Sequence, residues 1–176
     1  MKTLLFVILT LCAIVGLSTE QAHKRNPMPN GIPVVALPDS AGDYRSAQLT
    51  AAQLETLLKS GAVDAIIRLN GDSNGDGDIL STEEERALCQ KHGIPFFRLD
   101  AHVPAYRHHI VNVLNQYNAL VHCRHGVHRT GATVGQYLQQ RGYRPSQIIH
   151  HLGWEDYREK WEEPYHRYFT IAITPE

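Results

Sequence analysis

From residue 32 onwards, short apolar runs alternate with longer segments whose apolar residues recur every three or four positions. The short runs predict strands and the periodic segments predict helices. The predicted strands cover residues 32–37, 63–69, 95–99 and 119–122, with 44–48 as a short strand or loop. The predicted helices follow Thr50 as far as residue 58 and Ser81 as far as residue 92, and cover residues 106–117, 130–141, 146–152 and 154–161. This alternation predicts an α/β fold with a central, mostly parallel sheet flanked by helices.

Capping residues support two of these helices. Thr50 precedes the first predicted helix and can accept a hydrogen bond from its first turn, while Gly61 can end it. Ser81 and Glu84 have the spacing of a capping box, and Gly93 stands where that helix is expected to stop.

The first 18 residues have the pattern of a signal peptide. Lys2 precedes an apolar run over residues 4–17, and Gly16 and Ser18 supply the small residues expected before a cleavage site. We therefore expect an exported protein, periplasmic or secreted, cleaved after Ser18 and without a stable membrane span after processing. Residues 19–31 are polar and punctuated by Pro and Gly, which predicts a linker, and residues 32–176 would form one domain.

Two other interpretations of the N-terminus are weaker. An uncleaved membrane anchor is disfavoured because the apolar run is short for a bilayer span. A lipid-modified Cys12 is disfavoured because Leu11 is bulky and the apolar run continues past it.

Composition and charge exclude some classes of protein. The 176 residues carry 17 Lys and Arg against 18 Asp and Glu, a net charge of −1, so a general nucleic-acid binder is not expected. Three cysteines are too few for a disulfide scaffold, and only Cys89 and Cys123 remain after the predicted cleavage. Cys89 is expected in the core, with a regulatory disulfide to Cys123 as the alternative.

The segment 122–131 carries the strongest chemical signal. It reads His-Cys-x5-Arg-Thr-Gly and runs from a predicted strand into a predicted helix. Five intervening residues let the chain loop back so that Arg129 faces the sulfur of Cys123, while the amides of residues 124–129 converge on one anion. Arg129 offers a planar fork to two phosphate oxygens, and the same positive field stabilises a thiolate. Gly126 gives the loop a position without a Cβ.

This segment resembles the signature of the cysteine-dependent protein-tyrosine and dual-specificity phosphatase superfamily. Residues 44–48 (Tyr-Arg-Ser-Ala-Gln), 65–69 and 93–95 are similar to its small atypical dual-specificity branch, and the resemblance extends over about residues 32–169.

The resemblance implies a two-step hydrolysis of phosphomonoesters through a cysteinyl-phosphate on Cys123, with no cofactor in the chemistry. It also implies that His122 tunes the thiolate and that Thr130 donates a hydrogen bond to the departing sulfur. The implied phosphate-binding residues are Arg124, His125, Gly126, Val127, His128 and Arg129. The implied substrate is a phosphorylated protein or a small polyanionic phosphate, either phosphotyrosine-like or an inositol phosphate.

Such enzymes place an aspartic acid on a loop near the leaving group. Asp100 directly follows the predicted strand 95–99, which makes it the expected proton donor. The alternatives are that Asp100 caps the next helix, or that His102 is the acid.

Several basic residues are candidates for the rim of the site or for ordinary solvated charge. They are Arg45, Arg68, His102, Arg107, Arg124, His125 and His128. Two other functions remain open at this point: a catalytically weak phosphate- or polyanion-binding module of the same fold, and a sulfur-transfer enzyme of the rhodanese type. The intact nucleophile disfavours the first, and the Arg-Thr-Gly ending disfavours the second.

Residues 72–83 match the spacing of an EF-hand calcium loop. The expected ligands are Asp72, Asn74, Asp76, Asp78 through its carbonyl, and Glu83. A strand replaces the helix that normally precedes such a loop, so a paired EF-hand is not implied. The calcium would be structural, and the alternative is an acidic surface turn.

Overall fold

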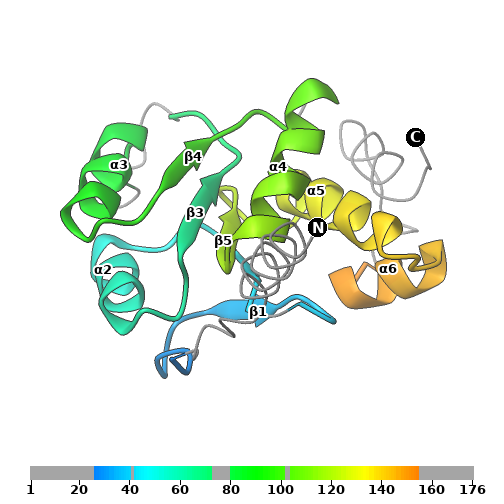
Figure 1. Ribbon diagram of the computed structural model, residues 1–176, viewed down its shortest axis with the longest axis horizontal. Helices are drawn as coiled ribbons and strands as arrows, with labels where there is room; N and C mark the ends of the chain where they lie inside the picture. Colours follow the sequence, from blue (N-terminus) through cyan, green and yellow to red (C-terminus); the bar gives the residue numbers. More distant parts are fainter. Residues whose placement is uncertain (1–25, 41, 73–79, 102–103, 155–176) are drawn as a thin grey trace, which may run out of the picture.

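The computed structural model describes residues 26–40, 42–72, 80–101 and 104–154 (Figure 1). Five strands form the sheet of this part of the chain: β1 Val34–Ala36, β2 Tyr44–Ser46, β3 Ala65–Arg68, β4 Phe96–Arg98 and β5 Ala119–His122. Their order is β1-β2-β5-β3-β4, and only β1 runs antiparallel to its neighbour. The expected mostly parallel sheet is confirmed.

Helices cover both faces of this sheet (Figure 1). They are α2 Ala51–Ser60, α3 Thr82–Lys91, α4 Pro104–Gln116, α5 His128–Gln140 and α6 Pro145–Leu152. Alternate strand residues separate two cores: Ile66 and Leu120 pack with α2 and α3, whereas Ile67 and Val121 pack with α4, α5 and α6. The predicted α/β class is therefore confirmed, with the sheet buried between two helical layers.

The capping predictions are confirmed at both helices. Thr50 accepts from the amide of Gln53, and Gly61 ends α2 with φ +64°. Ser81 and Glu84 form the expected reciprocal box at the start of α3. These caps fix where each helix leaves the strand that precedes it.

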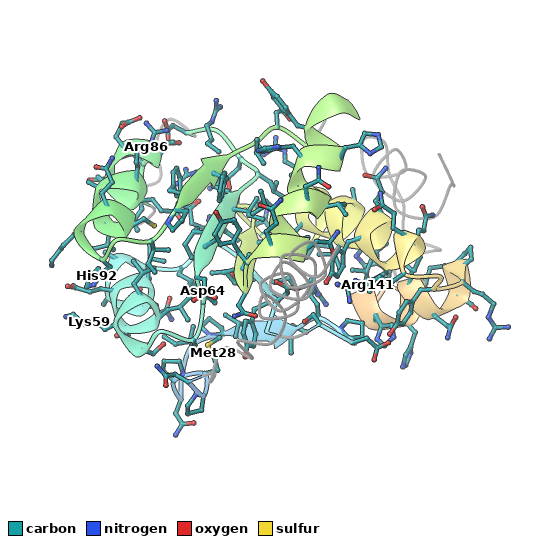
Figure 2. All side chains as sticks on the ribbon, viewed as in Figure 1. Met28, Lys59, Asp64, Arg86, His92 and Arg141 are labelled. Atoms are coloured by element: carbon teal, nitrogen blue, oxygen red, sulfur yellow. The ribbon has the colours of Figure 1, made fainter. Side chains whose placement is uncertain are left out.

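Charged side chains on the outer faces of the helices form local ion pairs. Lys59 pairs with Glu55 on α2, and Arg86 pairs with Glu83 on α3 (Figure 2). Within the described ranges, none of the helices combines the length and apolar character needed to cross a bilayer.

Several predicted boundaries differ from the observed ones by one or two residues, among them the starts of two helices. Helix α5 begins at His128 rather than at Thr130, and α4 begins at Pro104 rather than at residue 106. Val127 precedes the first turn of α5 and gives it no side-chain cap, so this start carries no capping signal in the sequence. The predicted signal peptide 1–18, most of the linker and nearly all of the predicted helix 154–161 lie outside the described residues.

Candidate active site

The candidate site lies where the parallel strands end. Cys123 directly follows β5, Asp100 follows β4 by two residues, and residues 69–72 follow β3. Because β2, β5, β3 and β4 are parallel, their carboxyl ends meet at one edge of the sheet. Ligands of open α/β sheets bind at this edge.

Residues 123–129 form the cysteine loop, and Gly126 lets this loop lie directly against the end of β2. Its φ is +71°, and a Cβ there would stand 2.4 Å from the amide nitrogen of Ala47 and 2.5 Å from the carbonyl carbon of Ser46. Both obstacles are backbone atoms, which cannot move aside as a side chain can. Residue 126 must therefore be glycine for two reasons: its positive φ, and its close contact with the backbone of β2.

Hydrogen bonds from β2 and from Gln48, two residues beyond its end, hold the loop in place. The Gln48 amide donates to the Arg124 carbonyl at 3.2 Å, and Arg45 Nη1 donates to the Gly126 carbonyl at 3.4 Å. Arg45 Nη2 also reaches the carbonyls of His151 and Leu152 at the end of α6. Through these hydrogen bonds, the Tyr-Arg-Ser-Ala-Gln segment holds the cysteine loop in position.

Arg45, a sequence candidate for the rim or for solvated charge, is half-buried and holds the loop through these hydrogen bonds. Its burial lowers the pKa of the guanidinium below the ordinary value. Its hydrogen-bonded neighbours are backbone carbonyls of the loop and of α6.

The N-terminus of α5 faces the cysteine loop without a side-chain cap. The first-turn amides of a helix have no acceptor within the helix, so an uncapped start suits an anion. Thr130 lies in this turn, and its Oγ1 is buried without a hydrogen-bond partner. Behind it, Gly131 packs on buried Trp154, whose ring would collide with any Cβ at residue 131.

A buried carboxylate joins the base of the cysteine loop to β3. Glu85 Oε1 lies 2.8 Å from His122 Nε2, and Glu85 Oε2 lies 2.7 Å from Arg68 Nη1. Burial alone would raise the pKa of Glu85, but the hydrogen bonds of His122 and Arg68, together with the charge of Arg68, outweigh it and hold the pKa below its ordinary value.

Arg68 belongs to this buried network and not to the rim. Its side chain is 1% exposed, and its Nε and Nη1 also donate to the carbonyls of Asn70 and Leu80. The guanidinium therefore fixes the chain that leaves β3. Arg68 was a candidate for the rim because the sequence of a strand does not show whether a charged residue in it has a buried partner.

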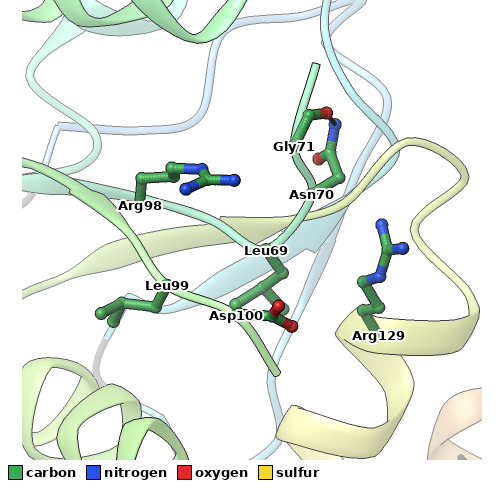
Figure 3. A pocket seen from close by; sticks show the side chains of 7 residues that line it. All are labelled: Leu69, Asn70, Gly71, Arg98, Leu99, Asp100 and Arg129. Atoms are coloured by element: carbon green, nitrogen blue, oxygen red, sulfur yellow. Dashed lines mark hydrogen bonds between the residues drawn. The ribbon is translucent and has the colours of Figure 1, made fainter. Parts of the chain in front are cut away.

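A cavity of about 50 Å³ opens between the ends of β3 and β4 and the start of α5 (Figure 3). Asp100 and Arg129 both line it, which brings two predicted site residues together. The lining also includes Leu69, Asn70, Gly71, Arg98 and Leu99, none of which the sequence analysis identified. Arg98 could have been found, since strand alternation places residues 98 and 100 on the same side of the chain.

The histidines of the loop are close to one another. The rings of His125 and His128 meet edge to face, with 6.2 Å between their centroids. Burial lowers the pKa of His128 below its ordinary value, and the charges of His125 and Arg129 lower it further. A pKa below the ordinary value of His leaves His128 mostly neutral at pH 7. Among the other rim candidates, His102 and the side chain of Arg107 lie outside the described residues.

The two described cysteines are free and lie on opposite faces of the sheet. Cys89 is fully buried between α3 and the strands, and burial together with the charge of Glu85 raises the pKa of its thiol to about 12. This confirms Cys89 as a core residue.

The predicted calcium loop is described only at its ends. Asp72 Oδ1 accepts from the amide and hydroxyl of Thr82 at 2.6 and 2.8 Å, and these hydrogen bonds lower the pKa of Asp72. Glu83 pairs with Arg86 at 2.7 Å. The other expected ligands, Asn74, Asp76 and Asp78, lie outside the described residues.

Comparison with known proteins identifies the class of fold. No family model and no curated protein matches the sequence. Among solved structures, the catalytic core of the S. cerevisiae PP-IP phosphatase Siw14, in complex with citrate, matches at a TM-score of 0.57. Its sequence identity is 18%, over 82% of this chain and 86% of that one.

A DUF442 protein from Shewanella putrefaciens CN-32 also matches at a TM-score of 0.57, with 19% identity over 79% of this chain and 87% of that one. PTPMT1 matches at 0.54, with 18% identity over 73% and 85% of the two chains, and its complex with PI(5)P matches at 0.50. The chain therefore has the fold of the cysteine-dependent protein-tyrosine and dual-specificity phosphatases.

Gly126→Ala is expected to break the cysteine loop, because the new methyl group would collide with the backbone of Ser46 and Ala47. Vanadate, an anion that mimics phosphate, should bind at least roughly tenfold more weakly, a loss of about 1.4 kcal/mol of binding free energy. Isothermal titration of both proteins measures this.

Gly142→Ala is the matched control. Gly142 has φ +84°, but nothing lies within 4 Å of its would-be Cβ. This variant should lose only about 1–2 kcal/mol of folding stability and keep its affinity for vanadate. Equal losses of vanadate affinity in both variants would mean that the contact with β2 is not what requires glycine at 126.

Proposed function

We propose that this protein is a cysteine-dependent phosphatase that hydrolyses phosphomonoesters. The observation that carries the proposal is the arrangement at the strand ends. A buried cysteine begins a loop pressed against β2, and the arginine that closes this loop lines one cavity with Asp100. The nucleophile, the anion-binding loop and the proton donor then belong to one site.

In the first step, the Cys123 thiolate attacks phosphorus in line with the ester oxygen. The S–P bond forms, the P–O bond breaks, and Asp100 donates its proton to the leaving oxygen. Arg129 and the loop amides hold the three remaining phosphoryl oxygens through the transition state. When the S–P bond breaks in the second step, the Thr130 hydroxyl donates a hydrogen bond to the departing sulfur.

In the second step, water attacks phosphorus from the side that the leaving group has vacated. The Asp100 carboxylate takes a proton from this water, the S–P bond breaks, and inorganic phosphate leaves while the thiolate is restored. The proposed sequence uses no cofactor, because side chains of the site supply nucleophile, acid and charge.

The cavity favours substrates with more than one anionic group. Arg98 and Arg129 both line it, so two guanidinium groups face the same space. A substrate with two anionic groups can pair with both arginines, whereas a single phosphate pairs with only one of them. The complexes of Siw14 with citrate and of PTPMT1 with PI(5)P hold anions of this kind. We propose a phosphotyrosine-like or inositol phosphate substrate, to be separated by assaying a phosphotyrosine peptide and inositol hexakisphosphate side by side.

Cys123→Ser should lower hydrolysis by at least about a thousandfold while vanadate still binds, because only the nucleophile is lost. Arg129→Lys should lose both, since an ammonium cannot make the two-pronged contact. The matched control is Cys89→Ser, the same change at a buried thiol on the other face of the sheet. If Cys123→Ser kept about a tenth of the activity, covalent catalysis by this residue would be wrong.

The same assays test the proton donor. Asp100→Asn should slow alkyl phosphates by roughly 100-fold and aryl phosphates with good leaving groups far less, because only the former need a proton on the departing oxygen. Equal losses on both substrates would assign the acid elsewhere, with His102 as the next candidate.

We also propose that the protein is exported, on the strength of Lys2 and the apolar run 4–17. Expression with its own N-terminus in a secreting host should yield a mature chain that starts at Thr19. An intact Met1 on the recovered protein, measured by mass spectrometry, would leave the segment as an anchor.

A structural calcium ion in residues 72–83 is a separate proposal. It is supported by the spacing of Asp72, Asn74, Asp76, Asp78 and Glu83. The side chains of Asp72 and Glu83 are 55% and 75% exposed, which fits a surface cation site. Calcium should raise the melting temperature of the wild type and leave Asp72→Ala/Glu83→Ala unchanged. No effect on the wild type in calorimetry would make the loop an ordinary turn.

A further inference from the structure

Glu85 is the one buried carboxylate, in the described part of the chain, whose two oxygens contact both walls of the candidate site. Oε1 contacts His122, the residue before the nucleophile, and Oε2 contacts Arg68, which fixes the chain leading to the cavity wall at 69–71. The side chains of Glu85, His122 and Arg68 are 3%, 2% and 1% exposed. Water therefore cannot replace either contact.

The chemistry of the three side chains fixes the direction of these hydrogen bonds. A guanidinium has only donors, so Glu85 Oε2 accepts from Arg68. The carboxylate in this ion pair has only acceptors, so His122 Nε2 must carry the hydrogen that points to Oε1. His122 Nδ1, the ring nitrogen nearer the main chain, is buried without a hydrogen-bond partner.

We propose that Glu85 is a positioning residue for Cys123: it holds His122 with its proton on Nε2 and joins this histidine, through Arg68, to the cavity wall at residues 69–71. The proposal rests on the proposed phosphatase function and deepens it. Glu85 contacts neither the thiol nor the substrate, so its effect on the reaction passes through the orientation of His122.

The substitution Glu85→Gln should move the ring proton of His122 from Nε2 to Nδ1. Because Arg68 can only donate, the amide oxygen of the new side chain must face Arg68, and its NH₂ group must face His122. The NH₂ group then donates to Nε2, which moves the imidazole proton to Nδ1. Nδ1 has no acceptor in its buried surroundings, so the chain must shift at the residue that precedes the nucleophile.

The experiment compares the full-length wild type with Glu85→Gln. Nitrogen-15 NMR of the histidine rings, with His122 assigned through a His122→Asn variant, should show a proton on Nε2 in the wild type and on Nδ1 in Glu85→Gln. The value of kcat should fall by roughly 10- to 100-fold, the range expected for displacing a reacting group by about an ångström. KM and vanadate affinity should change less than about twofold, since Arg129 and the loop amides are untouched.

Glu84→Gln is the matched control, because it makes the same change one residue away. Glu84 caps α3 through Ser81 and does not touch the network. Its variant should lose stability but keep both the wild-type ring signals of His122 and the wild-type kcat. A loss of kcat in Glu84→Gln equal to that in Glu85→Gln would reduce Glu85 to a structural residue of α3 and overturn the proposal.

Two measurements keep the proposal decidable if Glu85→Gln does not fold. A wild-type signal without a proton on Nε2 overturns it directly. Glu85→Asp keeps the charge for Arg68 but shortens the reach to His122, so an unchanged kcat would also overturn it. A wild type that hydrolyses no phosphomonoester would refute the proposed function, whereas the ring signals would still decide how Glu85 holds His122.

Discussion

The buried ion pair between Arg68 and Glu85 is the interaction on which the geometry of the strand ends depends. Taking two charges out of water is unfavourable, and a pair like this persists only where further hydrogen bonds satisfy the remaining donors and acceptors. Here the guanidinium also donates to Asn70, Leu80 and Asp72, and the carboxylate also contacts His122. Removing one partner of such a pair leaves an uncompensated charge, which destabilises a protein by about 3–5 kcal/mol. The ends of β3 and β5 are therefore fixed relative to α3.

Close contacts at two glycines also fix the cysteine loop and α5. The cysteine loop lies against β2 at Gly126, and α5 lies against Trp154 at Gly131, each at a distance that excludes even a methyl group. The loop is thus fixed from β2, from α3 through His122, and from the segment after α6. A loop fixed on three sides has its amides oriented in advance, which suits the anion binding proposed above.

Local patterns in the sequence were sufficient for the elements and for the cysteine loop. The run Ala-Leu-Val is apolar and follows Asn118, and β5 covers the same residues 119–122 that the pattern predicts. The box of Ser81 and Glu84 was also predictable, because its two members are three positions apart. The start of α5 was not, because Val127, the residue before its first turn, provides no side-chain cap that the sequence could signal.

Long-range partners could not be predicted in this way. Glu85 contacts His122 across 37 positions, and the pattern of α3 indicates only that residue 85 lies on its buried face. Gln48 likewise joins the loops after β2, β3 and β5 through contacts with Asn70, Leu80 and Arg124. Each of these residues has an ordinary local signal, and its importance arises only when the sheet order brings the strand ends together.

The separation of the two thiols has a consequence for oxidative damage. A thiolate nucleophile is open to oxidation to a sulfenic acid, which a neighbouring thiol can rescue by forming a disulfide. Cys89, the other described cysteine, packs on the far face of the sheet, and with a pKa of about 12 its thiol stays protonated and unreactive at neutral pH. Cys89 is therefore no resolving thiol for Cys123. In the proposed mechanism, recovery of an oxidised Cys123 would therefore depend on a reductant other than the described Cys89.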